Sequence, residues 1–194
     1  MKIVTMPIGA YQTNCYMVWG EGDKCVLIDP GYMAGALLEQ VEKQGKQLEA
    51  ILLTHGHFDH VGAVRDIAAD TDCKVYICDK ELSLPESLTA GKLYYTHTYD
   101  DGDTITAAGL TFDVLHTPGH TPGGVCLLCE DVLFSGDTLF AGSIGRTDFP
   151  GGDYDTIQAS LRRLAQLPKD YKVLPGHGDG STLEFERRTN PYLR

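Results

Sequence analysis

Three histidines and one aspartate lie within six consecutive residues, directly after the apolar run 50–53. They are His55, His57, Asp59 and His60. A strand that ends at such a cluster would point several of these side chains into one small volume. Imidazole nitrogens bind zinc, iron and related ions, and a nearby carboxylate can complete or bridge such a site. The cluster therefore predicts metal ligands at the end of a strand; a histidine-rich surface loop is the alternative.

Three more residues of ligand type occupy similar positions further along the chain. His120 lies in a stiff loop of prolines and glycines, Asp137 follows the predicted strand 131–135, and His177 lies in another glycine loop. With these, five of the seven histidines lie in glycine-bearing loops at strand ends. We therefore expect two adjacent metal sites, which Asp137 would bridge because one carboxylate offers two oxygens.

Two neighbouring divalent cations would supply hydrolytic chemistry. A water held between them loses a proton near neutral pH and becomes a hydroxide nucleophile. The cations would also polarise the attacked carbonyl and stabilise the oxyanion that forms. A serine or cysteine nucleophile is therefore not required.

The elements that must position these residues alternate along the chain. Strands are predicted at 2–6, 14–19, 24–29, 48–53, 74–78, 104–106, 110–116, 124–129, 131–135 and 171–174. Helices are predicted at 33–44, 61–69 and 154–166, with a last one that ends near 190. This order indicates a layered α/β fold in one domain, residues 1–194.

For two further segments, the sequence predicts only local features. Residues 79–102 predict only a short helix and a loop, which either borders the site or is a surface connection packed by its own aromatic residues. For the last helix, Ser181 and Glu184 have the spacing of a capping box.

Composition narrows the classes of partner. Apolar residues make up 42% and charged residues 22% of the 194, as in ordinary globular proteins. No apolar stretch approaches the length of a membrane span, and the start of the chain lacks the apolar core of a signal peptide, so we expect a cytoplasmic protein. The net charge of −11 disfavours nucleic acid, whereas bound cations would still admit an anionic small molecule. The oligomeric state stays open.

Six cysteines are present, and two of them form a Cys-x-x-Cys pair at Cys126 and Cys129. The pair lies inside the predicted strand 124–129, whereas redox pairs of this form usually sit at the start of a helix. We therefore expect buried thiols. His116, at the end of a predicted strand, is expected either to support the metal ligands without binding metal itself or to have a structural role.

The order of the ligand motifs resembles that of the metallo-β-lactamase superfamily. The matching strings are Thr-His-x-His-x-Asp-His at 54–60, Gly-His-Thr at 119–121, Gly-Asp-Thr at 136–138 and Gly-His at 176–177. The resemblance covers nearly the whole chain. It implies an αββα sandwich, in which two mixed sheets pack face to face with helices outside and metals at one edge.

The resemblance also implies how the ligands divide. Each ion would have three ligands of its own, and a seventh would bridge the two. The ligands would be His55, His57 and His120 for one ion, Asp59, His60 and His177 for the other, and Asp137 between them. Asp29, in an Asp-Pro-Gly turn, matches a position that orients the histidine loop, with a plain turn carboxylate as the alternative. Zinc is the first expectation for both ions, and iron or manganese would also fit such ligands.

Within the superfamily the sequence is most similar to the glyoxalase II family, the hydroxyacylglutathione hydrolases, in their short bacterial form. The similarity lies in 136–140 and 145–149. It implies hydrolysis of a thioester such as S-lactoylglutathione, with Asp59 and Asp137 as catalytic residues. Arg146 would clamp the glycine carboxylate of the thiol, unless it is a surface ion-pair partner. Classical members add a C-terminal helical domain, whereas this sequence predicts one helix there.

Other members of the superfamily provide the alternatives. True β-lactamases usually carry cysteine or serine where Asp137 stands, which argues against lactam cleavage as the main role. Persulfide dioxygenases share much of the ligand pattern and a string like 145–149, but they use one iron and O₂. Ribonuclease members need a basic surface. A non-enzymatic scaffold would be expected to lose ligands, yet all seven are present.

Overall fold

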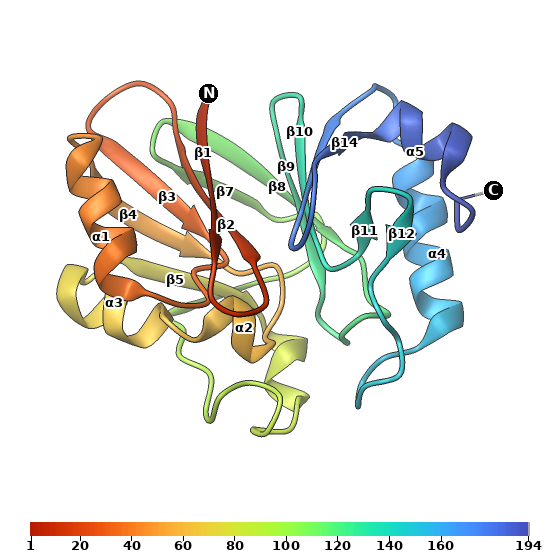
Figure 1. Cartoon of the computed structure of the whole chain (residues 1–194), viewed down its shortest axis with the longest axis horizontal. Helices are drawn as coiled ribbons and strands as arrows, with labels where there is room; N and C mark the ends of the chain where they lie inside the picture. Colours follow the sequence, from red (N-terminus) through yellow and green to blue (C-terminus); the bar gives the residue numbers. More distant parts are fainter. Residues whose placement is uncertain (194) are drawn as a thin grey trace.

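The computed structural model describes residues 1–193 and contains two mixed six-stranded sheets that face each other (Figure 1). The first sheet has the order β1 (Lys2–Ile8), β2 (Thr13–Trp19), β3 (Lys24–Ile28), β4 (Gln47–Leu52), β5 (Lys74–Cys78), β6 (His97–Tyr99). The second has the order β14 (Ser181–Thr182), β13 (Lys172–Pro175), β10 (Val132–Gly136), β9 (Val125–Cys129), β8 (Leu110–His116), β7 (Thr104–Ala107). A short hairpin of β11 (Leu139–Phe140) and β12 (Ser143–Ile144) forms a separate two-stranded sheet.

The helices cover the outer faces of the two sheets. Those beside the first sheet are α1 (Ala34–Lys43), α2 (Phe58–Val61) and α3 (Val64–Thr71), and a 3₁₀ turn η1 (Asp79–Ser83) follows β5. Beside the second sheet lie α4 (Tyr154–Ala165) and α5 (Leu183–Thr189). Figure 1 shows α1 and α3 on one outer side and α4 and α5 on the other. The predicted αββα sandwich is therefore confirmed. Within residues 1–193, no helix combines the length and the apolar composition that crossing a bilayer requires.

The main core lies between the sheets. Tyr16 of β2 packs edge-on against Phe134 of β10, with ring centroids 5.3 Å apart, and both side chains are buried. Burying one such large apolar side chain contributes about 1.5–3 kcal/mol. A smaller cluster lies under α4, whose Leu161 and Leu164 are fully buried. Asp153 caps that helix by accepting a hydrogen bond from the Thr156 N–H, as its position before the helix predicts.

Two pairs of parallel strands decide where the ligand loops meet. β3 runs parallel to β4 in the first sheet, and β10 runs parallel to β13 in the second. The carboxyl ends of parallel strands lie at the same edge of their sheet. Asp29 and Thr54 therefore follow neighbouring strands of one sheet, and Asp137 and His177 follow neighbouring strands of the other. The two edges face each other across the sandwich.

Three predictions of local structure need correction. The predicted helix 61–69 is two helices, α2 and α3, with a break at Gly62. A Cβ on Gly62 would lie 2.4 Å from the Gly31 carbonyl oxygen, and the Ala63 N–H bonds to Pro30 instead of continuing the helix. The chain that follows β3 thus interrupts the helix.

The segment 79–102 contains the strand β6, which we did not predict because it is three residues long and carries no apolar alternation. The segment does border the histidine loop, since the Phe58 N–H donates to the Leu88 carbonyl over 2.7 Å. The capping box at Ser181 and Glu184 is also wrong. Ser181 pairs with β13 as part of a strand, so the helix begins one residue later and Thr182 caps it through the Phe185 N–H.

Candidate metal centre

The histidine loop is buried between the two sheets. It leaves β4, and the Thr54 carbonyl accepts a hydrogen bond from the Val125 N–H at the start of β9, which ties one sheet to the other. His57 precedes α2 in an extended conformation, so Asp59 and His60 fall within the single turn of that helix. The one-turn helix therefore sends these two side chains in a different direction from His55 and His57.

The first ligand group consists of His55, His57 and His120, whose ring nitrogens lie within 4.8 Å of one another. All three Nε2 atoms are buried and have no hydrogen-bond partner within the described residues. Unpaired polar atoms are rare in protein interiors, so three that converge indicate lone pairs arranged around a common electron-pair acceptor. Burial, and then the rings of His120 and His60, lower the pKa of His57 to about 4, which keeps its lone pair free. The group fits a transition-metal cation.

The second group consists of Asp59, His60 and His177, again within 4.8 Å of one another. His177 Nε2 lies 3.2 Å from Asp59 Oδ2 and 3.3 Å from His60 Nε2. Burial alone would lower the pKa of His60, but the carboxylates of Asp137 and Asp29 outweigh it and raise that pKa to about 9. The same negative charge would favour a divalent cation at this position.

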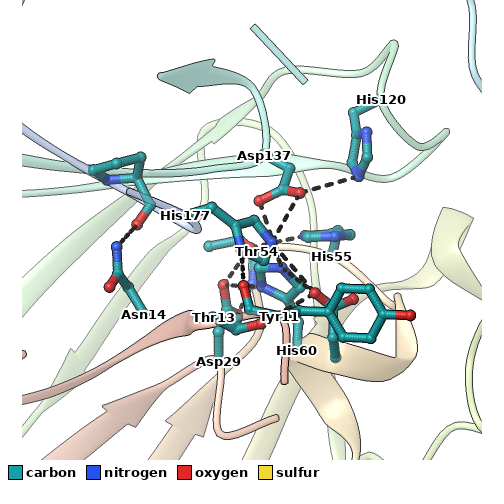
Figure 2. Close-up of polar contacts among 12 residues, drawn as sticks. Tyr11, Thr13, Asn14, Asp29, Thr54, His55, His60, His120, Asp137 and His177 are labelled. Carbon is teal, nitrogen blue, oxygen red and sulfur yellow. Dashed lines mark hydrogen bonds and ion pairs between the residues drawn. The ribbon is translucent and has the colours of Figure 1, made fainter. Parts of the chain in front are cut away.

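Asp137 lies between the two groups (Figure 2). Its Oδ1 is 3.4 Å from His60 Nε2, and its Oδ2 is 3.5 Å from both His120 Nε2 and His177 Nε2, so the carboxylate contacts members of both groups. The carboxylate has room because Gly176 is beside it: a Cβ there would lie 2.1 Å from Oδ1. This is the placement that a bridging ligand requires.

Asp29 supports the histidine loop from below. Its Oδ1 accepts a hydrogen bond from the Thr54 N–H over 2.8 Å, and its Oδ2 contacts Thr54 Oγ1 at 2.6 Å and His60 Nδ1 at 3.0 Å. By distance, Asp29 could also form a ligand set with His55 and His60. Its oxygens are already engaged by Thr54 and His60, and the contact at His60 Nδ1 leaves the Nε2 atom of that ring facing Asp137 and His177.

The first hairpin contributes residues that the sequence analysis missed. Buried Thr13 donates from Oγ1 to Asp59 Oδ2 over 3.0 Å. Asn14 donates from Nδ2 to the carbonyls of Pro175 and Gly178, on either side of His177. The Tyr11 carbonyl accepts from His177 Nδ1 over 3.1 Å. The sequence signal that could have identified Thr13 and Asn14 is their position: these two polar residues begin a strand that is otherwise apolar.

A pocket of about 500 Å³ opens above both groups. The aromatic rings of Tyr11, Phe58, Phe140 and Phe149 line it, together with Arg146. Such a mostly apolar hollow with a few polar groups at its base is typical of a small-molecule site.

Arg146 lies at the rim of this pocket and is about half exposed. Its guanidinium forms a bidentate ion pair with Asp148, with both distances 2.7 Å, and lies 3.7 Å above the Phe149 ring. Its backbone carbonyl accepts from His120 Nδ1 over 2.8 Å. Both sequence interpretations thus have a counterpart, because Arg146 borders the pocket and is also an ion-pair partner.

The cysteines and His116 lie outside the centre. Cys126 and Cys129 are free, buried thiols that belong to different core clusters, as we expected. His116 Nε2 contacts the Pro122 carbonyl at 2.9 Å and thereby stiffens the loop that carries His120.

Comparison with known proteins gives the same picture. Residues 8–177 match the family model of the metallo-beta-lactamase superfamily. Hydroxyacylglutathione hydrolase GloC of Haemophilus influenzae is 38% identical over 208 residues, covering 100% of this chain and 98% of that protein. The crystal structure of BLEG-1 B3 metallo-beta-lactamase has a TM-score of 0.90 at 38% identity, covering 99% of both chains. That of TTHA1623 in a di-iron-bound form has a TM-score of 0.87 at 41% identity, covering 98% of this chain and 100% of the other.

Three findings point to the same family. The fold is a sandwich of two mixed sheets, the candidate ligand loops lie at their facing edges, and the family model matches most of the chain. The protein is therefore a member of the metallo-beta-lactamase superfamily.

Proposed function

We propose that this protein is a dinuclear metal hydrolase that cleaves thioesters of the S-(2-hydroxyacyl) type, such as S-lactoylglutathione. The observation that carries the proposal is the placement of Asp137 between two three-residue ligand groups at the base of one pocket. The similarity to a hydroxyacylglutathione hydrolase along the full chain supports the substrate class.

Seven residues would hold the two ions: His55, His57 and His120 the first, Asp59, His60 and His177 the second, and Asp137 both. A pair of divalent cations at this position supplies Lewis acidity and lowers the pKa of a bound water to near neutrality. Zinc is the first candidate. Iron is the second, since the similar protein TTHA1623 has been crystallised in a di-iron-bound form.

The chain's own side chains would prepare the reaction. Asp59, held by Thr13, has a carboxylate oxygen at the base of the pocket and would orient the attacking water. The aromatic walls would exclude bulk solvent from the thioester carbonyl, which strengthens electrostatic stabilisation of the developing oxyanion. A thiolate is a good leaving group, so no strong general acid is needed.

Arg146 would receive a carboxylate of the thiol carrier. Its guanidinium fits bidentate recognition, and its position at the rim lies beyond the reacting carbonyl. Because Asp148 already pairs with this guanidinium, an incoming carboxylate has to compete with it. We therefore expect Arg146 to contribute modestly to affinity and not to the chemical step.

One experiment tests the proposal. The protein is purified with its native metal, the ions per chain are counted, and hydrolysis of S-lactoylglutathione is measured beside O₂ uptake with glutathione persulfide. Two ions with thioester hydrolysis support the proposal. One iron with O₂ uptake would replace it with a persulfide dioxygenase.

β-Lactam hydrolysis is the second candidate, because the similar protein BLEG-1 is described as a B3 metallo-beta-lactamase. The aspartate at 137 argues against it as the main activity, since true β-lactamases usually carry cysteine or serine there. A comparison of kcat/KM for a β-lactam and for S-lactoylglutathione, on the same preparation, separates the two. A larger kcat/KM for the β-lactam would make β-lactam hydrolysis the first candidate and thioester hydrolysis the second. A preparation that binds metal but turns over none of these substrates would favour a non-catalytic scaffold.

A further inference from the structure

Glu81 is a buried carboxylate that neither the ligand set nor the pocket includes. It lies in η1, in the segment that the sequence leaves least legible, and it is 0% exposed. Among residues 1–193, no lysine or arginine forms an ion pair with it. A buried carboxylate without a cation partner is costly unless N–H groups surround it.

The two oxygens of Glu81 contact two different loops. Oε2 accepts a hydrogen bond from the Gly56 N–H, and Oε1 accepts one from the Gly123 N–H, each over 2.6 Å. Gly56 lies between the ligands His55 and His57. Gly123 belongs to the loop of His120, which joins two strands of the second sheet. One side chain therefore connects the two loops that supply the first ligand group.

The fit at both glycines is close. A Cβ on Gly123 would lie 2.9 Å from Glu81 Oε1, and a Cβ on Gly56 would lie 3.1 Å from Oε2. The carboxylate thus occupies the space that side chains at these positions would need. The two N–H groups face it directly, as hydrogen bonds to a charged acceptor require.

Core packing alone does not account for a carboxylate here. Leucine has a similar volume and would fill the same space, but it would leave the buried Gly56 and Gly123 N–H groups without an acceptor. What leucine cannot do is hold two backbone N–H groups from different sheets at a fixed separation. That separation sets the distance between His55 and His57 on one loop and His120 on the other.

We propose that Glu81 is a positioning residue that preorganises the His55, His57 and His120 ligand group by fixing the two loops to each other. This inference rests on the metal ligands of the proposed function, but not on the substrate. Its effect is on metal affinity, because a group held in place before the ion arrives loses less conformational entropy on binding.

The variant Glu81→Gln tests it with little change in shape. A glutamine can accept one of the two hydrogen bonds, but its NH₂ group would face the other N–H, donor against donor. Metal-free protein is titrated with Zn²⁺ or Co²⁺ against a competing chelator. We expect about 10-fold weaker binding of one ion, as for other partners that orient metal ligands, and a changed Co²⁺ absorption spectrum.

Glu186→Gln is the matched control. Glu186 is also 0% exposed and accepts hydrogen bonds from the Gly142 N–H and Asn190 Nδ2, but it does not contact the two ligand loops. We expect this variant to lose thermal stability and to keep parent-like metal affinity. Equal affinity in the parent and in folded Glu81→Gln would overturn the inference. A parent protein that binds no metal would instead overturn the proposed function.

A measurement on the unaltered protein does not depend on whether the variant folds. Hydrogen exchange of the Gly56 and Gly123 amides is followed by NMR in the metal-free protein. We expect both to be protected at least about 100-fold, since both N–H groups bond to a buried acceptor. Exchange of either amide at the rate of an exposed loop would show that Glu81 does not hold the loops and would overturn the inference.

Discussion

The two ligand groups differ in how the protein holds them. The first consists of three imidazoles with unpartnered Nε2 atoms. The second contains a carboxylate. Thr13 donates a hydrogen bond to that carboxylate, whereas Asp29 and the Tyr11 carbonyl accept hydrogen bonds from its histidines. His177 is also the more open ligand, with 28% of its side chain exposed, whereas His60 is fully buried. The geometry of the first group therefore depends mainly on the distance between the loop of His55 and the loop of His120. The geometry of the second group depends mainly on its network of polar contacts.

Loss of the residue common to both groups should have the largest effect. Asp137→Ala removes the carboxylate that lies between them, so both ions lose a ligand. We expect thioester hydrolysis to fall by more than about 100-fold, because losing even an outer partner of a ligand costs about 10–100-fold. Metal analysis should show fewer ions per chain. Full metal content with full activity would mean that the two groups act separately.

Asp29→Asn should come next, because it weakens the support of the histidine loop that serves both groups. Asparagine keeps the shape, but it cannot accept at both oxygens from Thr54 and His60. We expect a loss of about 10–100-fold in metal affinity, measured by chelator competition. If only the stability to denaturant changes, Asp29 is a turn carboxylate and does not orient a ligand.

Thr13→Val should weaken metal binding at the second ligand group and leave the first group unaffected. Valine has nearly the same volume but loses the hydrogen bond to Asp59. We expect a smaller loss of metal affinity, about 5–10-fold, confined to the ion that Asp59, His60 and His177 would hold, together with lower kcat. Metal titration and kinetics on one preparation check this. A matching loss of affinity at the His55, His57 and His120 group would show that the groups are not held independently.

Arg146→Ala should have a smaller effect on turnover, because Arg146 lies outside both groups. We expect the KM for S-lactoylglutathione to rise about 3–10-fold with kcat unchanged, since an exposed ion pair contributes about 0.2–1 kcal/mol and a bidentate one somewhat more. A thioester without carboxylates is the control substrate and should be unaffected. An unchanged KM for both substrates would remove Arg146 from the thiol site.

Asp148→Asn is the counterpart of that variant. It removes the carboxylate that pairs with Arg146 and leaves the guanidinium in place. We expect the KM for the anionic substrate to fall about 2–3-fold, with a stronger dependence on salt. A rise in KM would mean that Asp148 orients Arg146 instead of competing with the substrate.

Local pattern was enough to predict much of the fold and the ligand residues. Alternating apolar runs and loops rich in glycine marked most strands, and the helix predicted at 154–166 agrees with α4. His55, His57, Asp59 and His60 stood out because four ligand-type residues in six positions after a strand are typical of a metal site. The errors fell where a distant part of the chain decided local structure. Gly31 interrupts the helix at Gly62, and β13 draws Ser181 into a strand.

Contacts between groups far apart in the chain follow from how the two sheets pack, and local pattern does not predict them. The polar pair Thr13 and Asn14 could not be assigned to Asp59 and His177 from spacing, because 46 residues separate Thr13 from Asp59. The role of Glu81 was equally hidden, since its two partners are backbone N–H groups that every loop possesses. Residue type fixes what a side chain can bind. The packing of two sheets fixes what it meets, and that depends on the summed contacts of the whole chain.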